Sequence, residues 1–416
     1  MTASLKKLAI VAVLLAMTLT LVFAGAGLAE DPATIESLGE RLYFDENLSQ
    51  PAGQSCASCH DPGFGFVDPD ADLPVSAGIL PDRFGTRNSP SSAYAMYAPT
   101  FHFDAGEGLW IGGQFWDGRA KGDVLGDPLA DQALGPFLNP VEMANQNKVQ
   151  VINNIAQSDY ADEFEQVWGE GSLDDVEAAY DMVALSIAAF ERTALFAQFN
   201  SKYDAYLQAC LALGGDPGAC AMGLGPKAKK AGKAIFSAEE WRGLQLFMGE
   251  NNNDGVLDKK EGAMCAACHV ADWTPSADNV VVPEWAPEGM VPPVFTDFTF
   301  DNLGVPKNTE YPLDPDAPAD LGLGPIVGDT NEDGKFKVMT LRNIGLTAPY
   351  AHNGLFKTLK EITHFYNTRD VPEEDWPMPE VGYTINTDEL GNLGLSDADE
   401  DALVLFMMTL SDGYQP

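Results

Sequence analysis

Two copies of the motif Cys-x-x-Cys-His, at residues 56–60 and 265–269, place the strongest limit on the structures open to this chain. This spacing is the signature of covalent c-type haem attachment. The two thiols add to the vinyl groups of one porphyrin, and the histidine that follows then falls beneath the iron as an axial ligand. The sequence therefore predicts two covalently bound haem c groups, attached through Cys56, Cys59, Cys265 and Cys268, with His60 and His269 as iron ligands.

Zinc binding and thiol redox chemistry are the alternatives for such motifs. A structural zinc site takes four protein ligands, and outside the two motifs the chain has only two further cysteines and three further histidines. A thioredoxin-like redox pair does not need the histidine. Two copies, each with its histidine, therefore favour haem over both alternatives.

The sequence repeats the same plan around each motif. Helical stretches at 35–44 and 238–248 lead into the motifs, with Gly39 and Gly243 at matching offsets. Proline and glycine punctuate the long stretches between the helical segments, and strand signals are few and short. We therefore expect a mostly α-helical protein built of two cytochrome c-like haem domains in tandem, with long ordered loops.

A second helix closes each half. Apolar residues recur at helical spacing after Ser172 and again after Ser396. Asp175 and Asp399 follow three residues later, which is a capping pattern for the start of a helix. A Gly-, Pro- and Lys-rich stretch separates the halves. On this basis we expect an N-terminal haem domain at 30–235 and a C-terminal haem domain at 236–416.

The N-terminus has the pattern of an export signal. Lys6 and Lys7 precede an apolar run, and small residues follow before a cleavage point after Ala29. The run is short for a bilayer span, so we expect residues 1–29 to be a cleaved signal peptide and the mature protein to be periplasmic, with no membrane span. The rival interpretation is an uncleaved anchor helix.

The net charge of −38 also limits the partners. Phosphates would repel a chain this acidic, so nucleic acid is excluded as a partner. A charged protein partner should present a basic face, although the acidity has an equally good explanation in solubility. The two cysteines outside the motifs, Cys210 and Cys220, flank a Gly/Pro turn, and in an oxidising compartment they could pair.

The second axial position of each iron decides between electron transfer and peroxide binding. A strong ligand there suits electron transfer, and an open position suits peroxide. Three histidines, His102, His352 and His364, remain outside the motifs. The residues alone do not assign any of them to an iron.

Several short sequence motifs lie along the chain. They are QSCASCHDP at 54–62, RNSP at 87–90, FWDGR at 115–119, QALGP at 132–136, NPVEM at 139–143, TLRN at 340–343 and TAPYAH at 347–352. Together these motifs are highly specific, and with them the sequence from Tyr43 to the C-terminus resembles the bacterial di-haem cytochrome c peroxidase/MauG family.

The resemblance implies a role for individual residues. His60 would carry the peroxidatic haem, with Gln132 and Glu142 as its distal pair. Glu142 is suited to moving a proton between the two peroxide oxygens, and Gln132 to holding an oxygen by a hydrogen bond. Trp116 would lie between the haems, and His269 would carry the second, electron-storing haem. The alternatives to these functional roles are that Glu142 is a surface carboxylate and that Trp116 packs in the core. An interdomain calcium ion would bind Asn88 and the main-chain carbonyls of Thr347 and Pro349.

The chain departs from the typical peroxidases of this family at two positions. A histidine that caps the resting peroxidatic iron is expected after the first motif, but residues 61–101 contain none, so this haem should be open as in MauG-like members unless His102 swings in. The position of the methionine ligand of the second haem is Tyr366, also as in MauG-like members. An anionic oxygen ligand lowers the reduction potential that methionine raises. The alternatives are that Tyr366 is a packing aromatic and that His364 or Met378 is the ligand.

Residues 250–261 are an insertion with the polar spacing, central glycine and final glutamate of an EF-hand loop. The first position is glutamate where aspartate is usual. This loop could bind a second calcium ion, but an acidic surface loop explains the same residues.

Three functions follow from the resemblance. The first is a peroxidase that reduces hydrogen peroxide through a ferryl intermediate, with electrons from a small cytochrome c or cupredoxin. The second is a MauG-like oxidase that uses peroxide to oxidise residues of a partner protein. The third, a non-enzymatic electron carrier, requires two six-coordinate haems and no role for Gln132 or Glu142.

Overall fold

The computed structural model describes residues 33–249 and 262–415. Every helix and strand of the described residues lies within the compact unit 35–416. The expected signal peptide and the EF-hand-like insertion lie outside the described residues.

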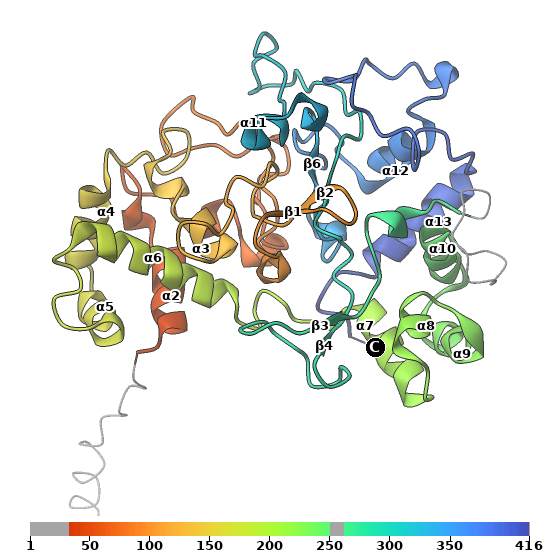
Figure 1. The fold of residues 1–416 in the computed structure, drawn as a ribbon, viewed down its shortest axis with the longest axis horizontal. Coiled ribbons are helices and arrows are strands. Elements are labelled where there is room, and N and C mark those ends of the chain that lie inside the picture. The colour runs from red at the N-terminus through yellow and green to blue at the C-terminus, as the bar shows by residue number, and fades with distance from the viewer. Residues whose placement is uncertain (1–32, 250–261, 416) are drawn as a thin grey trace, which may run out of the picture. The chain divides into compact units, whose positions relative to one another are not determined.

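The described part of the chain is mostly α-helical, as expected, with long irregular connections (Figure 1). Three short antiparallel pairs make up its strands, β1 (His102–Asp104) with β2 (Leu109–Ile111), β3 (Thr274–Pro275) with β4 (Met290–Val291), and β5 (Phe300–Asp301) with β6 (Phe336–Lys337). The helices are α2 (Ile35–Phe44), α3 (Pro128–Ala133), α4 (Lys148–Ala156), α5 (Ala161–Trp168), α6 (Val176–Glu191), α7 (Lys202–Ala212), α8 (Pro217–Ala221), α9 (Gly225–Ile235), α10 (Ala238–Met248), α11 (Gly324–Val327), α12 (Leu359–Thr368) and α13 (Asp397–Met408).

The repeat predicted from the sequence is present as two matching helix pairs, α2 with α6 and α10 with α13 (Figure 1). Both pairs cross at a glycine. A Cβ on Gly39 would lie 2.0 Å from the carbonyl oxygen of Ser186, and a Cβ on Gly243 would lie 1.9 Å from that of Ala402. Any larger residue would push the helices apart, which explains why both first helices carry glycine at the same offset.

Capping side chains begin the second helix of each pair. Ser396 caps α13 in a reciprocal capping box with Asp399, as predicted. The prediction for α6 is wrong by one turn, because its N-cap is Asp175, whose carboxylate accepts from Glu177 and Ala178 N–H groups, and not Ser172. Aspartate is as good an N-cap as serine and lies nearer the first apolar turn.

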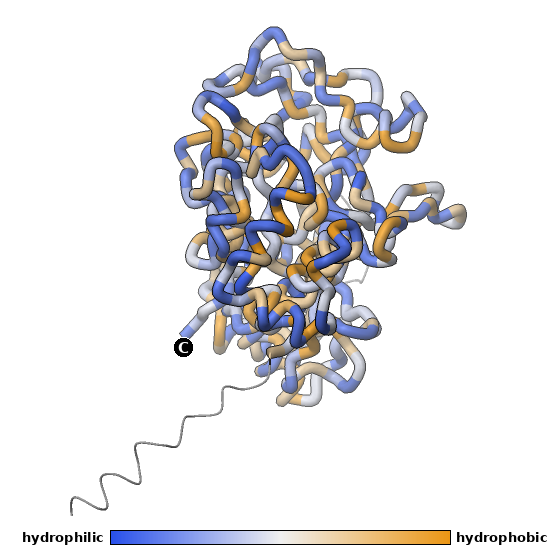
Figure 2. Tube along the Cα trace, turned by 90° about the vertical axis from the view of Figure 1, so that its left-hand side faces the viewer, coloured by the Kyte–Doolittle hydropathy of each residue, from blue (hydrophilic) through white to orange (hydrophobic). Residues whose placement is uncertain are grey.

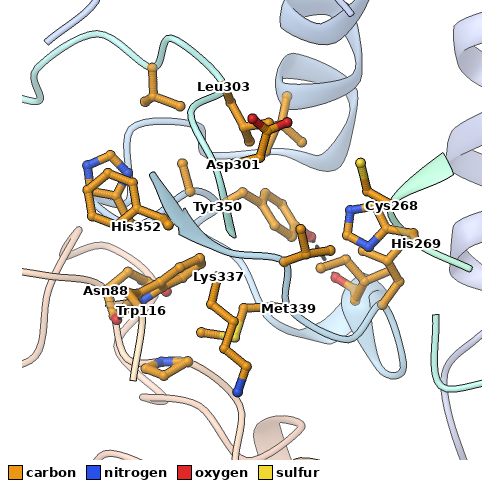
Figure 3. A pocket seen from close by; sticks show the side chains of 18 of the residues that line it. Asn88, Trp116, Cys268, His269, Asp301, Leu303, Lys337, Met339, Tyr350 and His352 are labelled. Carbon is orange, nitrogen blue, oxygen red and sulfur yellow. Dashed lines mark hydrogen bonds between the residues drawn. The ribbon is translucent and has the colours of Figure 1, made fainter. Parts of the chain in front are cut away.

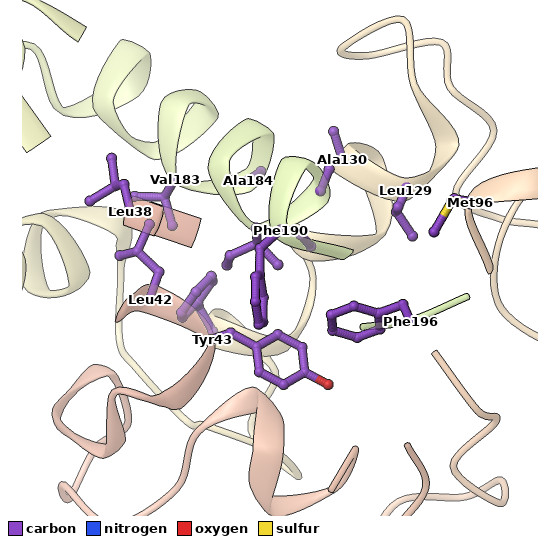
Figure 4. Close-up of a cluster of buried hydrophobic side chains, with 14 of the residues drawn as sticks. Leu38, Leu42, Tyr43, Met96, Leu129, Ala130, Val183, Ala184, Phe190 and Phe196 are labelled. Atoms are coloured by element: carbon purple, nitrogen blue, oxygen red, sulfur yellow. The ribbon is translucent and has the colours of Figure 1, made fainter. Parts of the chain in front are cut away.

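The buried apolar side chains form two clusters. Figure 4 shows part of the first, where Leu38 and Leu42 of α2 face Val183 of α6. The second contains residues of α7 to α10, α12 and α13, with α7 and α9 packed together. Val291 and Val294, from the later part of the chain, belong to the first cluster.

Apolar residues are interleaved with polar ones along the trace (Figure 2). Among the residues that the structure describes, no helix is long and apolar enough to cross a membrane. Cys210 of α7 and Cys220 of α8 form a disulfide, with Cα atoms 6.0 Å apart, which answers the question that the sequence leaves open. Gly215 lies against both sulfurs, where a Cβ would approach Cys220 Sγ to 2.3 Å.

Candidate functional site

Each Cys-x-x-Cys-His motif forms a single 3₁₀ turn, Cys56–Ser58 and Cys265–Ala267, in the wall of its own cavity. The histidine N–H closes the turn on the carbonyl of the first cysteine, at 3.0 Å in the first motif and 2.9 Å in the second. The N-terminal cavity has a volume of about 410 Å³ and the C-terminal cavity about 190 Å³.

The motif histidines are held in the same way in both cavities. His60 Nδ1 lies 3.2 Å from the carbonyl oxygen of Phe66, and His269 Nδ1 lies 3.0 Å from that of Phe295. Such a bond places the proton on Nδ1 and leaves Nε2 as the free donor atom for a metal. Burial lowers the pKa of both imidazoles, which favours the neutral form that binds iron.

The four motif cysteines lie in the cavity walls. Burial raises the pKa of the Cys59, Cys265 and Cys268 thiols to about 12. The described ranges contain no group of three or more His, Cys, Asp or Glu side chains that could hold a metal ion. Two thiols and one imidazole facing each cavity fit a covalently attached haem c.

The N-terminal cavity brings together the two residues predicted as the distal pair. Gln132 comes from α3 and Glu142 from the loop that follows, and both line this cavity with His60. The Asn139 side chain donates to Glu142 Oε1 at 2.6 Å. Burial raises the pKa of Glu142, while the Arg119 charge and the Asn139 bond oppose the rise. A buried carboxyl whose pKa lies above its usual range is suited to passing a proton.

Trp116 and Asn88 line both cavities. The indole Nε1–H donates to the main-chain carbonyl of Asn88 at 2.8 Å. Figure 3 shows the two residues beside one another at the edge of the C-terminal cavity, on the side away from His269. The predicted place of Trp116 between two haem sites is therefore consistent with the geometry.

Tyr366 of α12 lines the C-terminal cavity with Cys268 and His269. Burial is the main reason that its pKa is raised, and the two thiols of the motif add to the effect. The two alternatives lie elsewhere. His364 Nδ1 lies 2.8 Å from Glu400 Oε1, its ring is outside the cavity wall, and Met378 is 84% exposed.

The remaining histidines differ in position. His102 is exposed on β1, with Nδ1 2.8 Å from the carbonyl oxygen of Thr100, and lies in the wall of neither cavity. His352 is 5% exposed, lines the C-terminal cavity and stacks on Phe336 at 3.6 Å between ring centroids. Its Nε2 has no hydrogen-bond partner and lies 3.7 Å from Glu380 Oε2.

The three predicted calcium ligands lie in the wall of one cavity. Asn88, Thr347 and Pro349 all line the C-terminal cavity, although Asn88 comes from the other half of the chain. The side-chain amide of Asn88 donates to the Pro74 carbonyl at 3.2 Å, which leaves its Oδ1 available as a ligand. The donor set of one amide and two carbonyl oxygens is of the kind that calcium takes.

Two charged residues of the cavity walls are missing from the sequence prediction. Glu191, the last residue of α6, is 4% exposed in the N-terminal cavity, and burial raises its pKa to about 8. Lys337 of β6 is 5% exposed in the C-terminal cavity, and burial lowers its pKa to about 7. Glu191 directly follows Phe190 on the apolar face of its helix. A charged residue in this otherwise apolar pattern was the sequence signal that could have identified Glu191 as buried.

Comparisons with known proteins agree with this geometry. Residues 33–210 match the family model described as di-haem cytochrome c peroxidase. The chain is 35% identical to the methylamine utilization protein MauG of Paracoccus denitrificans, over 96% of this chain and 95% of that protein. It is 27% identical to the cytochrome c551 peroxidase of Nitrosomonas europaea, over 84% of this chain and 81% of that protein.

Solved structures give the same result. The diheme peroxidase BthA of Burkholderia thailandensis is similar with a TM-score of 0.72 and 29% identity, over 94% of this chain and 88% of that one. A MauG-like protein associated with microbial copper homeostasis matches with a TM-score of 0.58 and 26% identity, over 93% of this chain and 95% of that one.

Proposed function

The chain belongs to the di-haem cytochrome c peroxidase/MauG family, and from this membership we propose how its two cavities divide the work. The protein is an oxidoreductase that acts on hydrogen peroxide and carries two haem c groups. We assign the peroxide reaction to the N-terminal cavity and electron storage to the C-terminal cavity. His60 and His269 are the proposed iron ligands, and the motif cysteines form the thioether links.

In the N-terminal cavity, a haem held by His60, Cys56 and Cys59 would supply the two electrons that break the O–O bond of peroxide. Gln132 would orient the peroxide by a hydrogen bond from its side-chain amide. Glu142 would receive a proton from one peroxide oxygen and return it to the other, which would leave as water when the O–O bond breaks. Asn139 supports this role, because its bond to Oε1 fixes the carboxyl while burial keeps the proton affinity high.

Trp116 is the proposed electron path between the cavities, since it lies in the wall of both. Tyr366 is the proposed second ligand of the C-terminal iron. Of the three candidates Tyr366, His364 and Met378, only Tyr366 faces that cavity. An oxygen ligand stabilises the oxidised iron, which suits a site that gives up electrons to the peroxide reaction.

A calcium ion bound by Asn88, Thr347 and Pro349 is part of the same proposal. Asn88 also accepts the indole N–H of Trp116 through its carbonyl. An ion at this point would link the N-terminal and C-terminal halves next to the electron path. We place the mature protein in the periplasm after removal of residues 1–29, since the start of the sequence has the pattern of an export signal.

The observation that carries this proposal is the N-terminal cavity, which holds Gln132 and Glu142 but no second histidine. A cavity of this kind accepts peroxide at rest, before any electron arrives. The electrons would come from a small cytochrome c or a cupredoxin.

A second candidate function is MauG-like oxidation of residues in a partner protein. Tyr366 in the C-terminal cavity favours it, because a low-potential second haem is poorly matched to an ordinary electron donor. The 35% identity to MauG favours it as well.

The test is to add one equivalent of peroxide to the fully ferric, di-haem protein without reductant. We expect rapid consumption of the peroxide with changes in the absorption of both haems. Consumption only after one haem has been reduced would contradict an open resting site. Reduced cytochrome c or a candidate partner protein is then added to the oxidised product. Return of the ferric spectrum with cytochrome c supports the peroxidase, and its return with the partner protein supports the MauG-like oxidase.

A further inference from the structure

Trp116 belongs to a short segment with an unusual backbone. Gly113 and Phe115 both have positive φ angles, 71° and 66°. Gly113 is suited to this region, but the conformation is strained for a residue such as Phe115. The segment 113–116 therefore needs contacts from elsewhere to keep its shape.

Lys337 provides contacts at both ends of this segment. Its main-chain N–H donates to the carbonyl of Trp116 at 2.8 Å. Its Nζ donates to the carbonyl of Gly113 and lies 3.4 Å from Gln114 Oε1. One residue of β6 in the C-terminal half thus spans the whole segment that carries the tryptophan.

Burial makes these contacts of Lys337 unusual. The side chain is 5% exposed, and no carboxylate among the described residues forms an ion pair with it. Its nearest charge-stabilising contact is the ring of Phe298, with the centroid 5.7 Å from Nζ. An unpaired buried amine is costly, and here its hydrogen-bond partners are on the Trp116 segment.

The indole end of Trp116 is tied to the same strand by a second route. Trp116 Nε1 donates to the carbonyl of Asn88, and the N–H of Asn88 donates to the carbonyl of His352 at 2.7 Å. His352 stacks on Phe336, the residue before Lys337, with an interplanar angle of 9°. The contacts form a closed ring from Trp116 through Asn88, His352 and β6 back to Trp116.

We propose that Lys337 is the positioning residue of Trp116, and that its amine sets the electronic coupling between the two haem sites by fixing the segment 113–116. This inference rests on the proposed electron path through Trp116. The rate of electron transfer falls with the length of the path and with poorer alignment of the groups along it, so a displaced indole would slow the transfer. Loss of the amine would free the Gly113 end of the segment while the main-chain bond at Trp116 remained.

The experiment uses the di-haem protein and measures the rate of electron transfer between the haems after one-electron photoreduction. The variants are Lys337→Met, which keeps the length of the side chain but removes the amine, and Lys337→Arg, which keeps the donors. Lys335→Met is the matched control, because Lys335 lies two residues earlier and pairs with Glu332 at 3.0 Å. Haem content and unfolding temperature are checked for each variant.

We expect Lys337→Met to slow the transfer several-fold, and Lys337→Arg and Lys335→Met to retain most of the wild-type rate. In a Trp116→Phe background, Lys337→Met should cause no further loss, because both changes then act on the same path. If Lys337→Met does not fold, Lys337→Leu, which also lacks the amine, takes its place in the two Trp116 backgrounds.

An unchanged rate in Lys337→Met, or an equal loss with and without Trp116, would overturn the role of Lys337 while leaving the electron path intact. An unchanged rate in Trp116→Phe alone would show that the path itself is wrong. The two failures are therefore distinguishable.

Discussion

Asn139 donates its side-chain N–H to Oε1 of Glu142 at 2.6 Å, inside the cavity that also holds His60. Asn139 and Glu142 come from one short loop, so the motif NPVEM contains both the carboxyl group and the residue that holds it in place. This bond fixes one oxygen of Glu142 and leaves the other to meet a ligand in the cavity.

Replacing Glu142 with glutamine should slow peroxide consumption by about 10²–10⁴-fold. The amide has nearly the shape of the carboxyl but cannot accept and return the proton. Both haems should remain attached, which a pyridine haemochrome spectrum checks. Glu107→Gln, on the exposed turn after β1, is the control and should leave the rate unchanged. An unaltered rate in Glu142→Gln would remove Glu142 from the mechanism.

Replacing Tyr366 with methionine should raise the reduction potential of one haem by about 0.1 V or more, within the ~0.8 V that axial ligands cover. The reason is the change from an anionic oxygen to a neutral thioether. Spectroelectrochemical titration measures it. Tyr350→Phe is the control, since Tyr350 lines the same cavity but donates its hydroxyl to the Ile344 carbonyl at 2.9 Å. Equal potentials in wild type and Tyr366→Met would show that Tyr366 is not a ligand.

Glu191 should make stability depend on pH. Burial raises its pKa in the folded state to about 8, against 4.5 for the free side chain. The folded protein therefore binds more protons than the unfolded chain between these values, and the stability falls as the pH rises from about 4.5 to about 8. We expect the unfolding temperature of Glu191→Gln to fall less than that of wild type between pH 6 and pH 8.

Glu177→Gln is the matched control for this pH effect. Glu177 lies on the same helix, pairs with Lys148 at 2.6 Å and is 76% exposed. It should behave as wild type. The same pH slope in Glu191→Gln as in wild type would show that the Glu191 carboxyl is not the group that titrates.

Replacing Cys210 and Cys220 with serine should destabilise the C-terminal core. The disulfide closes a short loop, separation 10, and such crosslinks contribute about 2–4 kcal/mol. Denaturant unfolding at fixed haem content measures the loss. The peroxide reaction should persist, because neither cysteine lines a cavity. No change in the midpoint would mean that the crosslink adds nothing to the folded state.

The local parts of the site could be read from the sequence. The motif spacing predicts the 3₁₀ turn that directs both thiols and the imidazole into one cavity. The glycines at matching offsets, Gly39 and Gly243, mark the two helix crossings. These features depend on neighbours within a few residues or on a repeated pattern.

Contacts between distant residues could not be read in this way. Lys337 and Gly113 are separated by 224 positions, and nothing in the sequence around either residue indicates that they are in contact. Likewise, nothing in the sequence indicates that Val291 and Val294 pack in the first cluster with residues of the N-terminal half. The family resemblance supplied Asn88, Thr347 and Pro349 as a group, and only the fold places them around one cavity.

The central claim is that the N-terminal haem is open at rest because no side chain caps it. Electron paramagnetic resonance of the fully ferric protein at neutral pH tests this most directly, with His102→Ala as a companion variant because His102 is exposed outside both cavities. We predict one high-spin and one low-spin signal in equal amounts, unchanged in His102→Ala. Two low-spin signals in wild type would contradict the claim, and a switch of one to high spin in His102→Ala would identify that histidine as the cap.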